Sequence, residues 1–277
     1  MSLFSRFQRV LPQHLMSRGV GKLAASENSF VSRTFINWFA RQYKISLDDY
    51  EGDSLAEYPS FNAFFTRALK PGVRPLPEDS GVIVAPADGA ISQCGKVSNN
   101  NLLQAKGIEY SLESLLHSSQ AADAYEGGSF ATVYLSPSDY HRIHLPIAGQ
   151  LTSTTAIPGQ LYSVNADTEA NVDHLFCVNE RLVCHFETHG IPFSLVLVGA
   201  LIVASIETVW PGPASPYHQI IATPHNDQTF IRGAEVGRFL LGSTAILVIP
   251  PELGEIDVEL KTGAKVRMGE GIGYLKQ

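Results

Sequence analysis

Short runs of apolar residues separated by turn-forming residues fill the chain from about residue 60 onward. They are "GVIVAPADGAIS" (81–92), "ATVYLS" (131–136), "GQLYSV" (159–164), "RLVCHFET" (181–188), the run 193–209 and "TAILVIP" (244–250). Runs of this length, bounded by Gly, Pro, Asn and Ser, are typical of β-strands. The pattern predicts an α+β fold with a mainly antiparallel β core and a short helix within residues 102–120.

The first 44 residues follow a different pattern. Apolar positions recur at helical spacing over about residues 3–15, and Pro12 is expected to kink or restart that helix. A second helix is predicted over about residues 28–43, with bulky side chains at Trp38 and Phe39. These helices either pack on the chain's own core or form a basic amphipathic segment that lies in a membrane interface.

Charge is divided unevenly along the chain. The formal net charge is −7, which argues against general nucleic-acid binding, because such binding rests on neutralising phosphates. Residues 1–44 hold seven of the 20 Lys and Arg residues but one of the 27 acidic residues, and this basic end favours the membrane interpretation. The longest apolar run, residues 193–204, is too short to span a bilayer as a helix.

The stretch "RFLLGSTAILV" (238–248) predicts one buried strand that is interrupted by Gly242, Ser243 and Thr244. A serine inside an apolar run is hard for an outside substrate to reach, and its nearest carbonyl belongs to Gly242. This suggests self-processing, in which Ser243 Oγ attacks the Gly242 carbonyl and the amide becomes an ester. Loss of the Ser243 α-proton then eliminates the Gly242 carboxylate. The resulting dehydroalanine hydrolyses to a pyruvoyl group, which is an electron sink for decarboxylation.

Activation of Ser243 needs a base. The segment "SPSDYHRIHLP" contains two histidines, His141 and His144, beside Asp139, and a neutral imidazole can accept a proton near pH 7. Asp88 would complete an Asp-His-Ser arrangement, although Asp-Gly between apolar runs is first of all a hairpin signal. These residues show no recognisable metal-ligand spacing, so no metal site is predicted.

Four segments in order resemble the phosphatidylserine decarboxylases: "FNAFFTRALKPGVRP", "PADG", "YLSPSDYHRIHLP" and "LGST". The resemblance covers nearly the whole chain, is loosest in the N-terminal helices, and is closest to the short bacterial enzymes. It implies that Ser243 becomes the pyruvoyl group, and that Asp88 and His144 complete its self-cleavage triad. His141 matches a second active-site histidine, for substrate binding or proton delivery, and Asp139 belongs to the same motif.

The resemblance also implies products and partners. Cleavage between Gly242 and Ser243 gives a β chain of residues 1–242 and an α chain of residues 243–277. The two are expected to stay together as a heterodimer, because the cut would lie within one packed sheet; a dimer of such heterodimers is also open. The implied reaction converts phosphatidylserine in the membrane to phosphatidylethanolamine through a Schiff base with the covalent pyruvoyl cofactor.

Location and domain organisation follow from the same resemblance. Residues 1–58 would be the N-terminal basic membrane-binding region of a peripheral membrane protein, on the cytoplasmic face of the bacterial cell membrane. Residues 59–277 would be the β-rich catalytic domain. The expected partners are therefore the lipid substrate and the membrane surface, and not nucleic acid.

Two other interpretations remain at this point. One is a serine hydrolase that uses Asp88, His144 and Ser243 on an external substrate. The other is a non-catalytic carrier or membrane-binding module. It is suggested by a weak repeat between "RGAEVGRFL" (232–240) and "MGEGIGYLK" (268–276), which resembles the glycine-turned hairpins of lipoyl- and biotinyl-type domains. Both alternatives predict a chain that is never cut.

Overall fold

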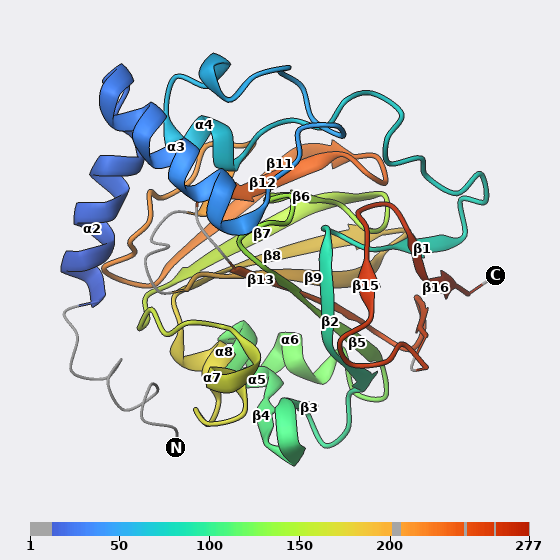
Figure 1. Ribbon diagram of the computed structural model, residues 1–277. Helices are drawn as coiled ribbons and strands as arrows, with labels where there is room; N and C mark the ends of the chain where they lie inside the picture. Colours follow the sequence, from blue (N-terminus) through green and yellow to red (C-terminus); the bar gives the residue numbers. More distant parts are fainter. Residues whose placement is uncertain (1–12, 201–205, 241–242, 258, 277) are drawn as a thin grey trace.

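Figure 1 shows the computed structural model, which describes residues 13–200, 206–240, 243–257 and 259–276. The helices are α2 (Gln13–Ala24), α3 (Ser29–Tyr43), α4 (Phe61–Phe65), α5 (Leu112–Leu116), α6 (Ser119–Asp123), α7 (Ala166–Glu169) and α8 (Leu175–Val178), with 3-10 turns at Leu55–Glu57 and Ala105–Gly107. The strands are β1 (Val82–Val84), β2 (Gly89–Lys96), β3 (Asn101–Leu103), β4 (Glu109–Ser111), β5 (Ser129–Leu135), β6 (Arg142–His144), β7 (Gly149–Ile157), β8 (Arg181–Thr188), β9 (Ile191–Val198), β10 (Ile206–Thr208), β11 (Ile221–Phe230), β12 (Glu235–Phe239), β13 (Ser243–Ile249), β14 (Gly254–Ile256), β15 (Lys265–Val266) and β16 (Gly271–Leu275). Neighbouring strands of these sheets pair antiparallel, so the predicted mainly antiparallel β core with added helices is confirmed.

One eight-stranded sheet forms the middle layer, in the order β11-β7-β8-β9-β13-β5-β2-β15. Strand β13 is buried at every position, as expected of a strand that is covered on both faces. Side chains alternate between the two faces along a strand, so Ser243 and Ala245 point to one face and Thr244 and Ile246 to the other. Ser243 and Thr244 therefore project into different layers of the molecule.

Two three-stranded sheets, β1-β16-β14 and β10-β12-β6, cover the face to which Ser243 points. The core on that side joins Ala245 and Leu135 of the large sheet to Ile143 of β6 and Ile272 of β16. The hairpin β3–β4 and the helices α5 to α8 cover the other face, where Ile246 is buried (lower part of Figure 1). The two small sheets thus enclose the Ser243 side of β13.

The large sheet is symmetric in its strand order. Each of the four strands counted inward from one edge corresponds to one of the four strands counted inward from the other edge. Strands β11, β7, β8 and β9 correspond to β15, β2, β5 and β13, and the sheet β6-β12-β10 corresponds to β1-β16-β14. Even the irregularities match, since the register shifts at Ile91/Gln93 of β2 and at Leu151/Ser153 of β7. The weak sequence repeat is therefore part of an internal duplication, with an approximate two-fold axis between β9 and β13.

Reciprocal backbone hydrogen bonds join the two halves. The His144 N–H donates to the Pro86 carbonyl at 2.8 Å, and the Val84 N–H donates to the Pro146 carbonyl at 3.2 Å. The two bonds are equivalent under the approximate two-fold axis. His144 therefore occupies the position that Val84 occupies in the other half.

The second half of the duplication is inserted into the first. The chain leaves the first half after β5, builds β6 to β12, and returns at β13. The expectation of one interrupted strand over residues 238–248 is therefore wrong: Phe239 ends β12 in a small sheet, whereas Ser243 begins β13 in the large one. The predicted cleavage point lies where the chain passes between two sheets, and not within one sheet. Residues 241–242 lie outside the described residues.

The N-terminal helices pack on α4. The predicted second helix is confirmed as α3, and its buried side chains Ile36 and Phe39 join the phenylalanines of α4 in one cluster. The same helix exposes Phe30 and Trp38, at 80% and 56% of their surface. The packing interpretation is therefore confirmed for one face of α3, while the membrane interpretation stays a prediction. The first predicted helix, about residues 3–15, falls mostly outside the described residues.

Two local expectations have clear outcomes. Residues 159–164 form no strand but an irregular segment with one isolated β-bridge between Gln160 and Asn179, and Asn179 also hydrogen-bonds to the backbone of Tyr162. Residues 102–120 contain α5 as predicted, preceded by the β3–β4 hairpin. Within the described ranges, no helix is long and apolar enough to cross a membrane.

Candidate active site

Ser243 begins β13 and lies opposite Leu135 of β5. It is fully buried, and its Oγ has no hydrogen-bond partner among the described residues. A buried hydroxyl without a partner costs about 1–3 kcal/mol, so such a group calls for an explanation beyond packing. The hydroxyl of Thr244, on the other face of the sheet, is buried and unpartnered as well.

His144 ends β6 and is nearly buried. Its Nδ1 lies 2.8 Å from the Gly233 carbonyl oxygen, and its Nε2 lies 3.0 Å from the Tyr140 hydroxyl. Because a carbonyl only accepts, Nδ1 carries the proton and Nε2 accepts from Tyr140. Burial lowers the pKa of His144, while the bond to Gly233 and the negative charges of Glu235 and Asp88 oppose that shift. The imidazole is therefore neutral near pH 7, with its basic lone pair on Nε2.

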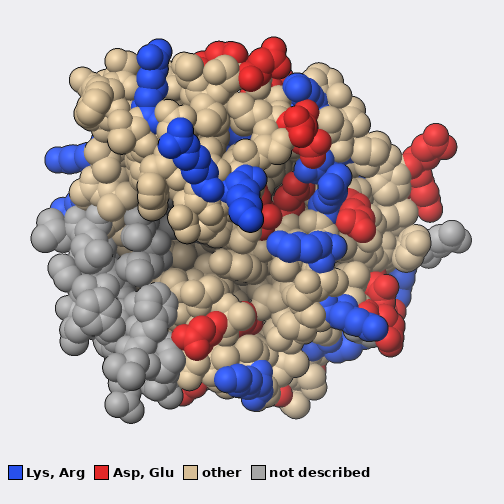
Figure 2. All heavy atoms as spheres, in the orientation of Figure 1, with Lys and Arg blue, Asp and Glu red and all other residues tan. Residues whose placement is uncertain are grey.

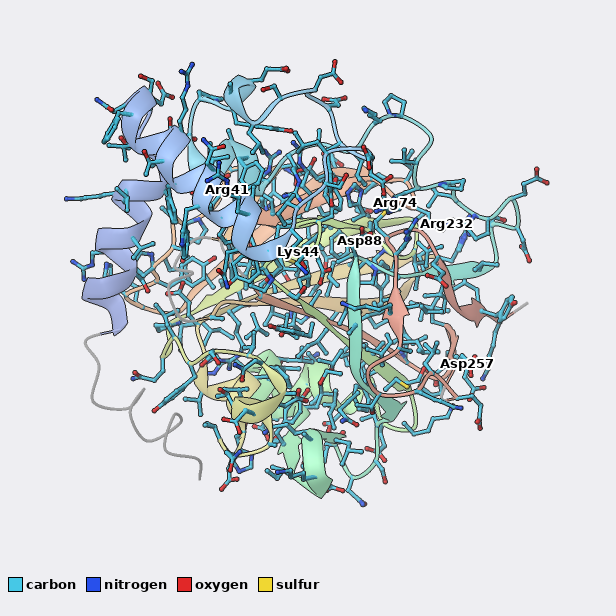
Figure 3. The ribbon with its side chains drawn as sticks, viewed as in Figure 1. Arg41, Lys44, Arg74, Asp88, Arg232 and Asp257 are labelled. Atoms are coloured by element: carbon cyan, nitrogen blue, oxygen red, sulfur yellow. The ribbon has the colours of Figure 1, made fainter. Side chains whose placement is uncertain are left out.

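Asp88 stands just before β2 and is held by three hydrogen bonds. Its Oδ1 accepts from Arg74 Nε at 3.1 Å and from the Met268 N–H at 2.8 Å, and its Oδ2 accepts from Arg74 Nη2 at 2.6 Å. The hydrogen bonds to Asp88 raise the pKa of Arg74 above its usual value. Figure 3 shows the two side chains next to each other, and both are almost buried.

His141 and Asp139 surround the backbone of Ser136. The fully buried His141 ring stacks on Phe65 with centroids 4.0 Å apart, and its Nε2 lies 3.0 Å from the Ser136 carbonyl oxygen. Its Nδ1 has no partner among the described residues. Burial, and next the charge of Arg67, lower the pKa of His141 to about 3. Asp139 accepts from the Ser136 N–H and hydroxyl, both at 2.7 Å, and so closes the turn after β5.

The predicted residues form two groups in one region of the fold. Asp88 and His144 are neighbours, because the His144 N–H donates to the carbonyl of Pro86. His141 lies against the end of β5 that faces Ser243. Within the described residues, no hydrogen bond joins Asp88 to His144 or His144 to Ser243. The structure thus brings these groups into one region without joining them as an Asp-His-Ser chain.

Two polar residues of this region escaped the sequence interpretation. Tyr140 stands inside the "SPSDYHRIHLP" segment, but its hydroxyl matters because the fold returns it to Nε2 of His144. Arg74 ends the segment "KPGVR" in a turn-rich stretch where an exposed arginine would be ordinary. Only tertiary structure shows that its guanidinium is buried against Asp88. No local signal distinguishes it.

A cavity of about 150 Å³ opens on the Thr244 face of the large sheet. Its walls include Ala90 and Tyr134, which stand in register with Thr244 across neighbouring strands, and the buried Glu169 of α7. Burial raises the pKa of Glu169, whose carboxylate accepts from the Ser92 hydroxyl at 2.6 Å. Figure 2, in the orientation of Figure 1, shows the molecule hollowed near its centre, with Lys and Arg side chains above the hollow.

Across the described residues, no group of three or more His, Cys, Asp or Glu side chains is placed to hold a metal ion.

Comparison with known proteins gives consistent matches. The family model described as phosphatidylserine decarboxylase matches residues 61–274, and a model described as PSD matches residues 3–44. The "Phosphatidylserine decarboxylase proenzyme" of Pseudomonas fluorescens is 46% identical over 98% of this chain and 96% of its own length. The proteins of the same name from Hahella chejuensis and Pseudomonas entomophila are 45% and 47% identical, over 100% and 97% of this chain and 96% of their own lengths.

These matches make the chain an enzyme of the carboxy-lyase class. More narrowly, it belongs to the phosphatidylserine decarboxylase family.

Proposed function

We propose that the protein decarboxylates phosphatidylserine to phosphatidylethanolamine after cutting itself between Gly242 and Ser243. The observation that carries the proposal is the hydroxyl of Ser243, which is buried and has no hydrogen-bond partner among the described residues, at the point where the inserted half returns to the large sheet. Before cleavage, an external substrate has no access to this fully buried hydroxyl, whereas the preceding peptide carbonyl is part of the same chain. The family match and the word "proenzyme" in the relatives' names support the same view.

In the proposed cleavage, Ser243 Oγ loses its proton to a base and bonds to the Gly242 carbonyl carbon. The peptide C–N bond breaks, and the Ser243 nitrogen takes up the proton. Removal of the Ser243 α-proton then breaks its Cβ–Oγ bond and releases the Gly242 carboxylate. Water replaces the nitrogen of the resulting dehydroalanine as ammonia, which leaves a pyruvoyl group at the start of residues 243–277.

The surroundings of Ser243 suit such a group. Its neighbours are apolar strands, and its side chain makes no hydrogen bond that conversion would break. A pyruvoyl group supplies an electrophilic carbonyl that acts as an electron sink for loss of carbon dioxide. The chain's own task is then to bury that group, exclude water and place a proton donor nearby.

The two histidines differ in how readily they accept a proton. His144 lies near the negative charges of Glu235 and Asp88, which favour its protonated form. His141 lies near the positive charge of Arg67, which disfavours it. We therefore assign the base to His144 and leave substrate contact or proton delivery to His141. Nε2 of His144 must exchange its bond with Tyr140 for one with the serine hydroxyl.

The cut chain is expected to stay assembled as an α/β heterodimer. Residues 243–277 contain β13, which pairs with β5 on one side and β9 on the other. They also contain β16, which pairs with β1, and β15, which pairs with β2. All four neighbours belong to residues 1–242. Whether two heterodimers associate further is a separate proposal that the measured mass of the native enzyme tests.

Residues 1–58 are proposed as the membrane-binding region of a peripheral protein, on the cytoplasmic face of the bacterial membrane, and residues 59–277 as the catalytic domain. The α3 helix exposes Phe30 and Trp38 and carries Arg41 near its end, followed by Lys44 (Figure 3). Exposed aromatic and basic side chains together fit an anionic lipid surface.

A denaturing gel combined with intact-mass measurement tests this function. We expect two fragments, residues 1–242 and 243–277, with the smaller one blocked to Edman degradation and reactive to hydroxylamine. The preparation should release carbon dioxide from phosphatidylserine in mixed micelles. A single full-length species with full activity would contradict the proposal, and its labelling by serine-directed phosphonates would support a hydrolase instead. An intact, inactive chain without a reactive carbonyl would favour a carrier module.

A further inference from the structure

We propose that Arg74 is a positioning residue for self-cleavage: it holds the Asp88 carboxylate beside His144 while Ser243 reacts. The inference rests on the proposed function, because it concerns the same reactive centre. It adds a residue that neither the sequence motifs nor the Asp-His-Ser arrangement requires.

The contact between the two side chains is bidentate and almost buried. Arg74 uses Nε and Nη2 for the two oxygens of Asp88, at 3.1 and 2.6 Å, and Nη1 for Asp49, at 2.9 Å. The exposed fraction of the Arg74 side chain is 6% and that of Asp88 is 11%, whereas Asp49 is 41% exposed. Paired N–H donors fix the plane of a carboxylate in a way that a single donor does not. Asp88 is therefore the partner whose orientation Arg74 determines.

The internal duplication shows that the fold does not itself require a carboxylate at the position of Asp88. In the two-fold arrangement, Pro86 corresponds to Pro146, so that Asp88 corresponds to Ala148. Ala148 lines an open cavity of about 590 Å³. Only the half with Asp88 therefore carries an almost buried negative charge at this position. Such a charge needs a partner of opposite sign, and Arg74 is that partner.

The short segment from Arg74 to Leu76 packs against both halves of the duplicated fold. Leu76 lies against Gly233 and Gly269, two equivalent glycines with φ of +79° and +86°. A Cβ on these residues would come within 2.6 Å of Leu76 Cδ1 and 3.0 Å of Leu76 Cδ2. The carbonyl of Gly233 holds His144, and the N–H of Met268, next to Gly269, holds Asp88. One short segment thus contacts both turns that hold the predicted catalytic residues.

Asp88 then acts on His144 through its charge. When His144 accepts the Ser243 proton, the imidazolium is stabilised by a carboxylate held at a fixed place and orientation. Without Arg74, the carboxylate keeps one backbone donor, from Met268, and is free to rotate. Self-cleavage should slow for that reason, even if the fold persists.

The test follows cleavage of freshly translated full-length chain on a denaturing gel. We expect Arg74→Met to slow cleavage by about 10- to 100-fold, the loss typical of removing a partner that orients a functional group. The cleavage rate of Arg74→Lys should lie between those of the wild-type chain and Arg74→Met. Added guanidinium should restore part of the rate that Arg74→Met loses. The double variant Arg74→Met/Asp88→Asn should be no slower than Asp88→Asn alone, because Arg74 acts through Asp88.

Two controls separate this role from general stability. Asp49→Asn removes the other carboxylate of Arg74 and should cleave at nearly the normal rate. Arg181→Met removes another arginine, which is buried and donates to four backbone carbonyls away from Asp88, and should lower stability but not the cleavage rate of folded chain. If Arg74→Met fails to fold, Arg74→Lys decides the matter by the same comparison.

Several results would overturn the inference. They are a normal cleavage rate in folded Arg74→Met or Arg74→Lys, or multiplicative losses when Arg74→Met is combined with Asp88→Asn. Failure of the proposed function looks different, because the wild-type chain would then remain uncut in the same assay.

Discussion

The imidazole of His144 is anchored by the carbonyl of Gly233, whose oxygen lies 2.8 Å from Nδ1. That contact fixes the tautomer and leaves Nε2 as the basic atom. It also ties the histidine to the Gly233 turn of the inserted half. The equivalent turn of the other half, at Met268 and Gly269, holds Asp88. A backbone carbonyl thus takes the place that the sequence interpretation gave to the Asp88 side chain.

Tyr140→Phe should shift the pH dependence of self-cleavage. The Tyr140 hydroxyl donates to Nε2 of neutral His144, and burial raises the pKa of Tyr140 so that it stays a donor. This bond favours the neutral imidazole, so its loss raises the pKa of His144 and protonates the base at higher pH. We expect the acid limb of the cleavage-rate profile to move to higher pH, with a stability loss of about 0.5–1.5 kcal/mol. An unmoved acid limb would remove His144 from the role of base.

Acid should destabilise the fold through its buried histidines. The pKa of His141 is lowered from 6.5 to about 3 in the folded chain, so the unfolded chain binds the proton more readily between those values. Stability should therefore fall as the pH drops below about 7, by up to about 1.4 kcal/mol per pH unit for one such histidine. Urea denaturation of the uncleaved Ser243→Ala chain at several pH values measures the slope.

The matched variants identify the histidine responsible. His141→Asn should reduce that slope, whereas replacement of the exposed His218 by Asn should leave it unchanged. Equal slopes in the two variants would show that the acid sensitivity comes from other groups, such as the partly buried His185, whose pKa burial also lowers.

Gly89→Ala should damage the fold, and Gly95→Ala, in the same strand, should not. A Cβ on Gly89 would lie 2.4 Å from the Tyr134 carbonyl oxygen, whereas one on Gly95 would make an ordinary 3.5 Å contact with Phe130. Forcing β2 away from β5 should cost about 1–3 kcal/mol and displace the adjoining Asp88. Thermal unfolding and the cleavage assay check both effects. Equal melting temperatures for the two variants would show that the strand adjusts freely.

Phe30→Ser should weaken binding to anionic vesicles. Phe30 is 80% exposed on α3, and burying such a side chain in lipid contributes about 1.5–3 kcal/mol, or roughly tenfold or more in affinity. Tyr274→Ser is the matched control, since this aromatic residue is 67% exposed on β16, away from α3 in Figure 1. Flotation at low and high salt separates the apolar contribution to vesicle binding from the electrostatic contribution, because salt screens only the latter. Similar flotation of the two variants would assign α3 to packing alone.

Much of this fold could be predicted from the sequence, because strands such as β5, β8 and β13 coincide with short apolar runs. The prediction failed at residues 238–248, where apolar residues of two different strands adjoin in the chain. Local pattern carries no sign that Phe239 and Ser243 belong to different sheets. It also read Asp88-Gly89 first as a hairpin signal, whereas Gly89 is required by the close approach of β2 to β5.

The sequence analysis named candidate site residues but not the hydrogen bonds that hold them. Motif residues such as His141, His144 and Ser243 are visible because polar groups stand inside apolar sequence. Their partners, Gly233, Arg74 and Tyr140, depend on how the fold returns the chain to one place. A backbone carbonyl, in particular, leaves no trace in the sequence.

Because one half of the fold is inserted into the other, the proposed cleavage between Gly242 and Ser243 would make the enzyme a split protein. After that cleavage, the first half would consist of β1, β2 and β5 from one piece and β13 to β16 from the other, while the inserted half would stay whole. Residues 243–277 alone would be a 35-residue fragment with too little surface to bury. Such a fragment folds only as the complement of its partner. The enzyme should therefore lose its active-site strand and its structural integrity in the same step if the two pieces are ever separated.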